Sequence, residues 1–227
     1  MIYILHIETS TKVCSVALSL NGQLVQYQTI VADGFVHSEK LNGLIEQVVN
    51  DAEIEFKQLN AISVSGGPGS YTGLRIGVST AKGLCYALNI PLIAIDSIEC
   101  IVRWAKSNFP NYSGLYCGMI DARRMEVFSA IYSANLTLVK PLSADELDEN
   151  SYSKYTESNQ ILLCGDGALK LNELWANRTQ FVFSEILSDA RGQVEQAFYL
   201  YKTAQFVDTA YYEPYYLKDF IAGTKKG

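Results

Sequence analysis

The chain has 227 residues, with 24 acidic and 18 basic side chains and a formal net charge of −6. This length allows one large domain or two small ones, and an apolar fraction of 48% is ordinary for a soluble globular protein. Proteins that grip nucleic acid by themselves usually carry a basic face, because contacts to phosphates supply most of the affinity. No basic cluster exceeds the Lys-Lys pair near the end of the sequence, so we expect any nucleic acid to be held by a partner.

The first residues, MIYILHIETS, predict a buried strand rather than a signal peptide, because they have no basic start and Glu8 interrupts them early. No apolar run approaches membrane-spanning length. The five cysteines include no C-x-x-C pair. Together these features predict a cytoplasmic protein, with no membrane association and with reduced, buried cysteines.

The first half of the chain alternates between strand and helix patterns. Residues 21–22, Asn-Gly, form a strong hairpin signal between two alternating apolar runs. Two segments follow in which apolar residues recur at intervals of three and four, which predicts two amphipathic helices. A third helix is expected after them, with Ser97 as its N-cap. The predicted strands are residues 2–9, 13–20, 23–31, 61–66 and 91–97, and the predicted helices are residues 37–52, 73–89 and 98–107.

The second half repeats this pattern. Residues 116–141 read as strand, turn, strand, turn, strand, as residues 3–27 do, and in each half the first strand ends on an acid, Glu8 or Asp121. A helix beginning at Ser143 is expected next, since Ser143 and Glu146 have capping-box spacing. Strands at 160–167 and 180–185 and helices at 168–176 and within 188–205 complete the half. The sequence therefore predicts a duplicated two-domain α/β protein, with domains 1–109 and 110–227 and an aromatic tail, YYEPYYLKD, docked on the body.

The stretch SVSGGPGSYTGLRIG, residues 63–77, lacks both phosphate-binding fingerprints. The P-loop needs a lysine that is absent here, and Thr72 stands where G-x-G-x-x-G requires its last glycine. Ser70 in this turn is not part of the hydrolase signature G-x-S-x-G, and only His6 and His37 could serve as a base. The favoured interpretation is a tight strand-to-helix joint, with Thr72 as the helix cap. Glycines in the following helix indicate a close neighbour, either the helix's own sheet or another protein.

Seven segments occur in the order expected of the TsaB (YeaZ) family, which the chain resembles over nearly its whole length. They are IETSTKVCSVAL, HSEKL, GGPGSYTGLRIGVSTAKGL, AIDS, DARRMEVF, GDGA and EPYYLKD. The resemblance implies a duplicated actin-like (ASKHA, ribonuclease-H-type) fold of two βββαβα-like domains. It also implies a role in making threonylcarbamoyladenosine beside the anticodon of tRNAs that read codons beginning with A.

The same resemblance implies a non-catalytic scaffold subunit that activates the larger relative TsaD, which carries the metal and transfers the threonylcarbamoyl group. The ATPase TsaE joins the complex, tRNA is met only through it, and the chain alone is expected to form a homodimer. No cofactor is expected to be bound tightly by this chain, with ATP or ADP only at the level of the complex. The two histidines are 31 positions apart, so metal-ligand spacing is also lacking.

The family pairs through its first two helices, so we expect no catalytic or metal-binding residues and a partner interface on these helices. The expected interface residues are His37, Leu41, Gly43, Leu44, Val48, Gly73, Leu74, Gly77, Val78, Ala81 and Leu84. Packing against the chain's own sheet is the other explanation for the apolar stripe on each helix. The candidates for a place near a nucleotide or anion are Glu8, Ser70 and Arg75, although Glu8 replaces the aspartate of actin-like ATPases. The alternatives are an actin-like ATP-dependent phosphotransferase, a glycoprotease-like peptidase and a homodimer with a different binding role.

Overall fold

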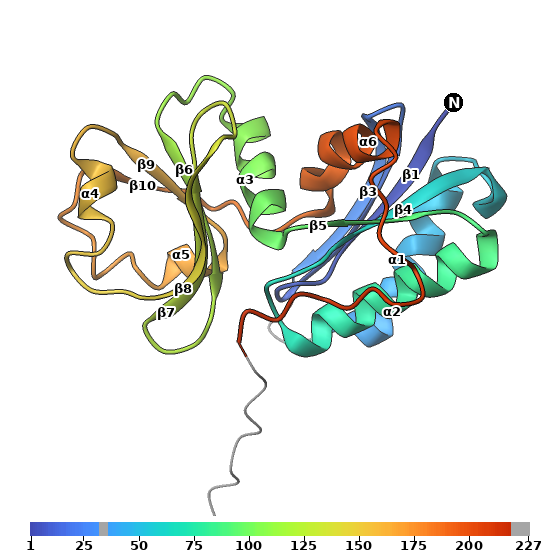
Figure 1. The fold of residues 1–227 in the computed structure, drawn as a ribbon, viewed down its shortest axis with the longest axis horizontal. Helices are drawn as coiled ribbons and strands as arrows, with labels where there is room; N and C mark the ends of the chain where they lie inside the picture. Colours follow the sequence, from blue (N-terminus) through green and yellow to red (C-terminus); the bar gives the residue numbers. More distant parts are fainter. Residues whose placement is uncertain (32–35, 219–227) are drawn as a thin grey trace, which may run out of the picture.

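The computed structural model describes residues 1–31 and 36–218, which form two lobes that each contain a five-stranded mixed sheet (Figure 1). The first sheet has the order β3-β2-β1-β4-β5 and the second the order β10-β9-β6-β7-β8. In each lobe the first three strands form an antiparallel meander, and the last two are parallel to the first strand of the lobe. The two halves therefore share one topology, and the predicted duplicated actin-like fold is confirmed.

The strands follow the alternation of apolar residues. The first sheet contains β1 (Tyr3–Glu8), β2 (Val13–Leu20), β3 (Gln23–Val31), β4 (Leu59–Ser65) and β5 (Leu92–Ile95). The second contains β6 (Leu115–Asp121), β7 (Glu126–Tyr132), β8 (Leu138–Glu146), β9 (Ile161–Cys164) and β10 (Phe181–Phe183). The predicted hairpin between β2 and β3 is present, with Asn21 and Gly22 both at positive φ, as a type I′ turn requires.

Helices cover both faces of the first sheet. Helices α1 (His37–Asp51) and α2 (Tyr71–Leu88) pack on one face, where Leu5 and Ile7 of β1 join their apolar stripes. Ile4 points to the opposite face, which is covered by the 3-10 helix η2 (Ala190–Gln193) and by α6 (Val194–Lys202). The chain thus returns to the first lobe after β10. The division into domains 1–109 and 110–227 stays a prediction, with these late elements packed on the first sheet.

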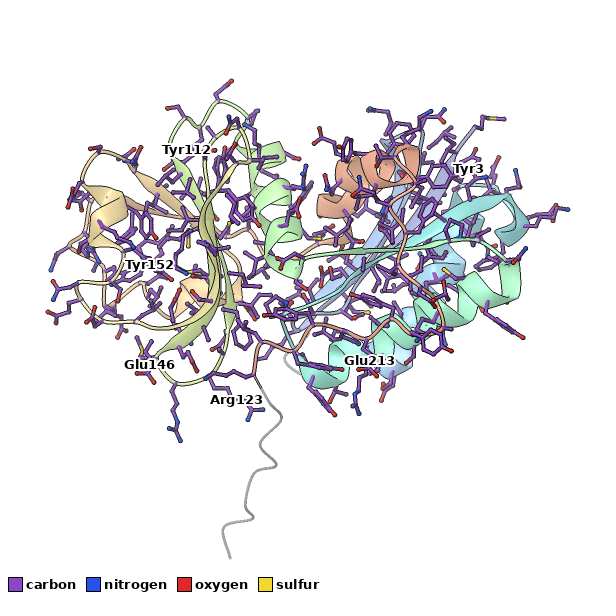
Figure 2. All side chains as sticks on the ribbon, in the orientation of Figure 1. Tyr3, Tyr112, Arg123, Glu146, Tyr152 and Glu213 are labelled. Carbon is purple, nitrogen blue, oxygen red and sulfur yellow. The ribbon has the colours of Figure 1, made fainter. Side chains whose placement is uncertain are left out.

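Helix α3 (Ser97–Asn108) lies between the two sheets, in contact with η2 on one side and with β6 on the other (Figure 1). The remaining elements are the short helices η1 (Phe56–Gln58), α4 (Ser153–Thr156) and α5 (Asp166–Leu169). Side chains fill both lobes, and Figure 2 shows Tyr152 inside the second, where it lies edge-on to the fully buried Trp175. All five cysteines are buried and free, as predicted.

Several local predictions were wrong. The helix expected at Ser143 is the end of β8, because Ser143 and Ala144 pair with β7 and the ladder overrides the local capping signal. The helix expected at 168–176 is reduced to the four residues of α5, followed by turns. Helix α2 is capped by Ser70, not Thr72, and α3 by Asp96, whose carboxylate accepts hydrogen bonds from two amides of the first turn.

Candidate functional site

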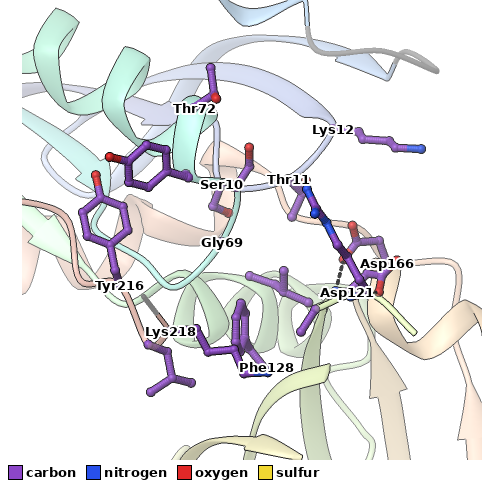
Figure 3. Close-up of a pocket in the computed structure, with 16 residues that line it drawn as sticks. Ser10, Thr11, Lys12, Gly69, Thr72, Asp121, Phe128, Asp166, Tyr216 and Lys218 are labelled. Carbon is purple, nitrogen blue, oxygen red and sulfur yellow. Dashed lines mark hydrogen bonds between the residues drawn. The ribbon is translucent and has the colours of Figure 1, made fainter. Parts of the chain in front are cut away.

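A pocket of about 580 Å³ opens between the two lobes, beside the glycine-rich loop that precedes α2. The first lobe contributes residues 10–12 and 69–72, and the second lobe contributes residues 120–123, Phe128 and Asp166. The C-terminal residues 216–218 complete the wall. Figure 3 shows Tyr216 and Lys218 on one side of the pocket and Asp121 and Asp166 on the other. A concave site at a lobe junction is where small molecules commonly bind.

The acidic side of the pocket is held by bonds within the second lobe. Asp121 forms an ion pair with Lys170 at 2.6 Å and also accepts a hydrogen bond from the backbone amide of Arg123 at 2.8 Å. Asp166 accepts from the backbone amide of Asp121 at 3.1 Å, and its pKa is raised, chiefly by burial. The Lys170 ammonium also donates to the carbonyl of Arg124 at 2.8 Å, so this lysine clamps the turn between β6 and β7.

Glu8 does not line the pocket. Its side chain is fully buried and accepts hydrogen bonds from the Ser10 amide at 2.7 Å, the Ser10 hydroxyl at 2.6 Å and the Ser65 hydroxyl. Burial raises the pKa of the Glu8 carboxyl, and these hydrogen bonds act in the opposite direction. Ser10, which does line the pocket, separates Glu8 from it. The structure therefore gives Glu8 the role of an anchor for the loop after β1.

Ser70 and Arg75 occupy different environments. Ser70 lines the pocket, where its hydroxyl accepts a hydrogen bond from the Gly73 amide at 3.2 Å and caps α2. Arg75 lies outside the pocket lining, with its guanidinium carbon 4.1 Å from the centre of the Tyr71 ring and its Nε donating to the Tyr216 hydroxyl at 3.3 Å. Of the three predicted anion-proximal residues, only Ser70 reaches the pocket.

A buried network of hydrogen bonds links β2, β1, β4 and η2, and no motif or spacing in the sequence predicts it. The Ser63 hydroxyl donates to Gln193 Oε1 at 2.6 Å, so His6 Nδ1, 2.7 Å from Ser63, must be the donor of their bond. His6 Nε2 then accepts from Ser19 at 2.8 Å. Burial lowers the pKa of His6 to about 3. All four side chains are fully buried, so this serine–histidine contact has no access to a substrate and holds β1, β2, β4 and η2 together.

The glycines of the central stretch are required by close neighbours within the chain. A Cβ on Gly73 or Gly77 would overlap Thr9, and one on Gly69 would overlap Ser10. A Cβ on Gly66 or Gly67 would overlap the C-terminal residues Tyr212 and Tyr215, respectively. The prediction of a tight strand-to-helix joint is confirmed. Gly69, Gly73 and Gly77 lie against the loop after β1, whereas Gly66 and Gly67 lie against the C-terminal residues.

Most of the predicted interface residues lie in the core of this chain. Nine of the eleven are buried: His37, Leu41, Leu44, Val48, Gly73, Leu74, Gly77, Val78 and Ala81. Gly43 is exposed and Leu84 is half-buried. The opposite face of the two helices is open to solvent: a Cβ on Gly43 or Gly83 would meet nothing within 4 Å, and Tyr86 is 88% exposed. A partner that docks on α1 and α2 would therefore meet this outer face.

Among residues 1–31 and 36–218, no three His, Cys, Asp or Glu side chains are grouped so that they could hold a metal ion. The same ranges contain no helix that is both long and apolar enough to span a membrane.

Solved structures share the fold. YeaZ from Pseudomonas aeruginosa superposes with a TM-score of 0.79 over 96% of this chain and 100% of its own, at 21% identity. Component A of (R)-2-hydroxyglutaryl-CoA dehydratase from Acidaminococcus fermentans gives a TM-score of 0.51 over 90% of this chain and 99% of its own, at 12% identity. The two lobes, their common topology and the pocket between them define a protein of the duplicated actin-like class.

Sequence comparison is more specific. The family model for TsaD, tRNA N6-adenosine threonylcarbamoyltransferase, matches residues 35–223. The tRNA threonylcarbamoyladenosine biosynthesis protein TsaB of Bacillus subtilis is 33% identical over 63% of this chain and 60% of its own length. The protein of the same name from Haemophilus influenzae is 25% identical over 98% of this chain and 96% of its own. The chain thus spans about three fifths of the first relative and nearly all of the second, and it belongs to the TsaB (YeaZ) family.

Proposed function

We propose that the chain is a non-catalytic subunit in the synthesis of tRNA threonylcarbamoyladenosine, and that it activates a TsaD-type transferase by docking on it. Its relatives support the pathway, because they are named as threonylcarbamoyladenosine biosynthesis proteins. The observation that carries the docking role is the outer face of α1 and α2. The open space at Gly43 and Gly83 lets another backbone approach closely, and Tyr86 offers a large exposed side chain. Aromatic anchors of this kind dominate the binding energy of many interfaces.

Further parts of the proposal concern the assembly. The TsaE ATPase would join the pair, tRNA would be bound through the complex, and ATP or ADP would bind at the level of the complex. The net charge of −6 supports the view that a partner holds the tRNA. In the absence of the transferase, the same helix face would bury itself in a two-fold homodimer, since a self-complementary patch is the usual basis of such dimers.

The test is threonylcarbamoyl transfer to tRNA by purified TsaD, TsaE and threonylcarbamoyl-adenylate synthase, with and without this chain. Gly43→Arg and Gly83→Arg place a long side chain on the outer face without touching the core, so we expect loss of both TsaD binding in calorimetry and transfer. Gly83→Ala is the matched control and should retain both. Gly77 is unsuitable, because it is buried against Thr9 and a larger residue there perturbs folding. Full transfer without the chain, or undiminished binding by both arginine variants, would refute the proposal.

The interlobe pocket favours a second candidate, an actin-like phosphotransferase. Its volume of about 580 Å³ and the basic residues Lys12, Arg123 and Lys218 in its lining suit a phosphorylated small molecule. Against it, Asp121 is already paired with Lys170 and Glu8 is sealed from the pocket. Calorimetry of the isolated chain with ATP and magnesium distinguishes the two: tight binding that Lys12→Ala abolishes favours the phosphotransferase, and no binding favours the partner subunit.

A further inference from the structure

Residues 207–218, the C-terminal segment, begin at the edge of the first lobe. The amide of Val207 donates to the carbonyl of Leu92 at 3.0 Å, which adds an antiparallel bridge to the edge strand β5. The ammonium of Lys82, on α2, then donates to the carbonyls of Ala210 and Tyr212, each at 3.0 Å. In Figure 1 this segment runs alongside α2 toward the second lobe. Its first half is therefore fixed by hydrogen bonds to the first lobe.

The middle of the segment lies flat on the glycine-rich loop. The amide of Tyr215 donates to the carbonyl of Gly66 at 2.7 Å, and the Tyr212 hydroxyl approaches the same carbonyl at 3.4 Å. Side chains at Gly66 and Gly67 would collide with Tyr212 and Tyr215, respectively. Gly67 also has a φ of +108°, where glycine is strongly favoured. Two glycines of the central stretch thus make room for residues about 150 positions further along the chain.

The last described residues connect the two lobes. The Tyr216 ring centre lies 5.0 Å from that of Tyr71 at the start of α2, on the first lobe. Leu217 packs against the apolar cluster that α3 forms with the second sheet, and Lys218 forms an ion pair with Glu126 of β7. Tyr216, Leu217 and Lys218 all line the interlobe pocket. A single run of chain therefore contacts both sides of the pocket and forms part of its wall.

We infer that residues 207–218 form a strap that sets the angle between the lobes and closes one side of the pocket. The lobes are also joined through α3, which contacts η2 of the first lobe and β6 of the second. The strap is therefore a second connection between the lobes. The strap is held more weakly on the second lobe than on the first. Its contacts there are the half-buried Leu217 and an ion pair whose Lys218 side chain is 50% exposed. Release at this end would let the pocket widen while the first half of the strap stays bound. The inference does not depend on the docking role proposed above.

The test measures the distance between the lobes by pulsed electron paramagnetic resonance. Spin labels are placed at Ser79→Cys on the exposed face of α2 and at Leu138→Cys on β8, since the five native cysteines are buried. The unmodified strap should give one narrow distance distribution. Leu217→Asp combined with Lys218→Glu should broaden it, because the variant removes both contacts to the second lobe. Lys202→Glu, the same charge change on the exposed surface of α6, is the matched control and should leave it unchanged.

A charge exchange provides a rescue. Lys218→Glu alone should broaden the distribution and speed hydrogen exchange at the Tyr215 amide by about two- to fivefold. Addition of Glu126→Lys should restore both, because it recreates the ion pair with its signs reversed. If the double variant at Leu217 and Lys218 does not fold, Lys218→Glu and its rescue decide the question. Distance distributions and Tyr215 exchange that match the unmodified strap in every variant would overturn the inference.

Discussion

The contact between Gly77 and Thr9 yields a prediction with an internal reference on the same helix. A Cβ at Gly77 would overlap the Thr9 hydroxyl, whereas one at Gly83, six residues later on α2, would meet nothing. Replacing glycine by alanine inside a helix gains about 1 kcal/mol of helix propensity at either position. Overpacking a filled site costs about 1–3 kcal/mol. Because the propensity gain is common to both, the difference between Gly77→Ala and Gly83→Ala isolates the overpacking cost.

We expect Gly83→Ala to raise the free energy of unfolding by about 0.5–1 kcal/mol, and Gly77→Ala to be less stable than Gly83→Ala by about 1–3 kcal/mol. For a chain of this size, each 1 kcal/mol shifts Tm by roughly 2–4 °C. Urea unfolding followed by circular dichroism measures the free energy of unfolding of both variants. Equal stability of the two alanine variants would refute the reasoning, because the close approach to Thr9 would then carry no cost.

A double-mutant cycle identifies the atom responsible. Thr9→Ala removes the hydroxyl that a Cβ at Gly77 would meet and leaves the Thr9 Cβ at 3.4 Å, an ordinary contact. The single Thr9→Ala change also removes the hydrogen bond from this hydroxyl to the Gly73 carbonyl, at 2.8 Å, and should cost about 1 kcal/mol. In this background Gly77→Ala should no longer destabilise the chain. A cost that persists unchanged would place the clash elsewhere.

Three further predictions concern the stability of each lobe. Burial raises the pKa of Asp96 from 3.8 to about 6, so its contribution to stability is greatest below pH 4 and declines as the pH rises to about 6. Asp96→Asn keeps the helix cap and removes the buried charge, so the variant should have a higher free energy of unfolding than the unmodified chain at pH 7. This difference should shrink by up to about 3 kcal/mol when the pH falls from 7 to 4. A difference that does not change with pH would contradict this. Arg191→Lys loses the two-point ion pair with Asp189 and the stacking on Tyr27 at 4.0 Å, and should lower the free energy of unfolding by on the order of 1–3 kcal/mol in urea titrations. Trp175→Ala empties a fully buried site and should cost about 3–5 kcal/mol, which calorimetry would show as a lowered Tm; a Tm equal to that of the unmodified chain would refute the burial argument.

The sequence by itself determined the features that depend on near neighbours in the chain. The Asn21-Gly22 hairpin and the apolar stripes of α1 and α2 followed from spacing, because turn geometry and helical period act over a few residues. The repeat of strand and helix patterns indicated the duplicated fold. Ordered motifs indicated the family, which the comparisons confirm. Where a local signal competed with sheet pairing, as at Ser143, the ladder to β7 prevailed and the sequence-based prediction was wrong.

Only the tertiary structure decided what each residue of the candidate sites touches. The stripe positions on α1 and α2 are core residues, and the face open to a partner is marked by Gly43, Gly83 and Tyr86. The central glycines accommodate Thr9, Ser10 and the C-terminal segment, all within the chain itself. Such contacts join residues about 60 to 150 positions apart. They leave no period or spacing in the sequence, because which residues meet depends on how the sheets and helices pack together.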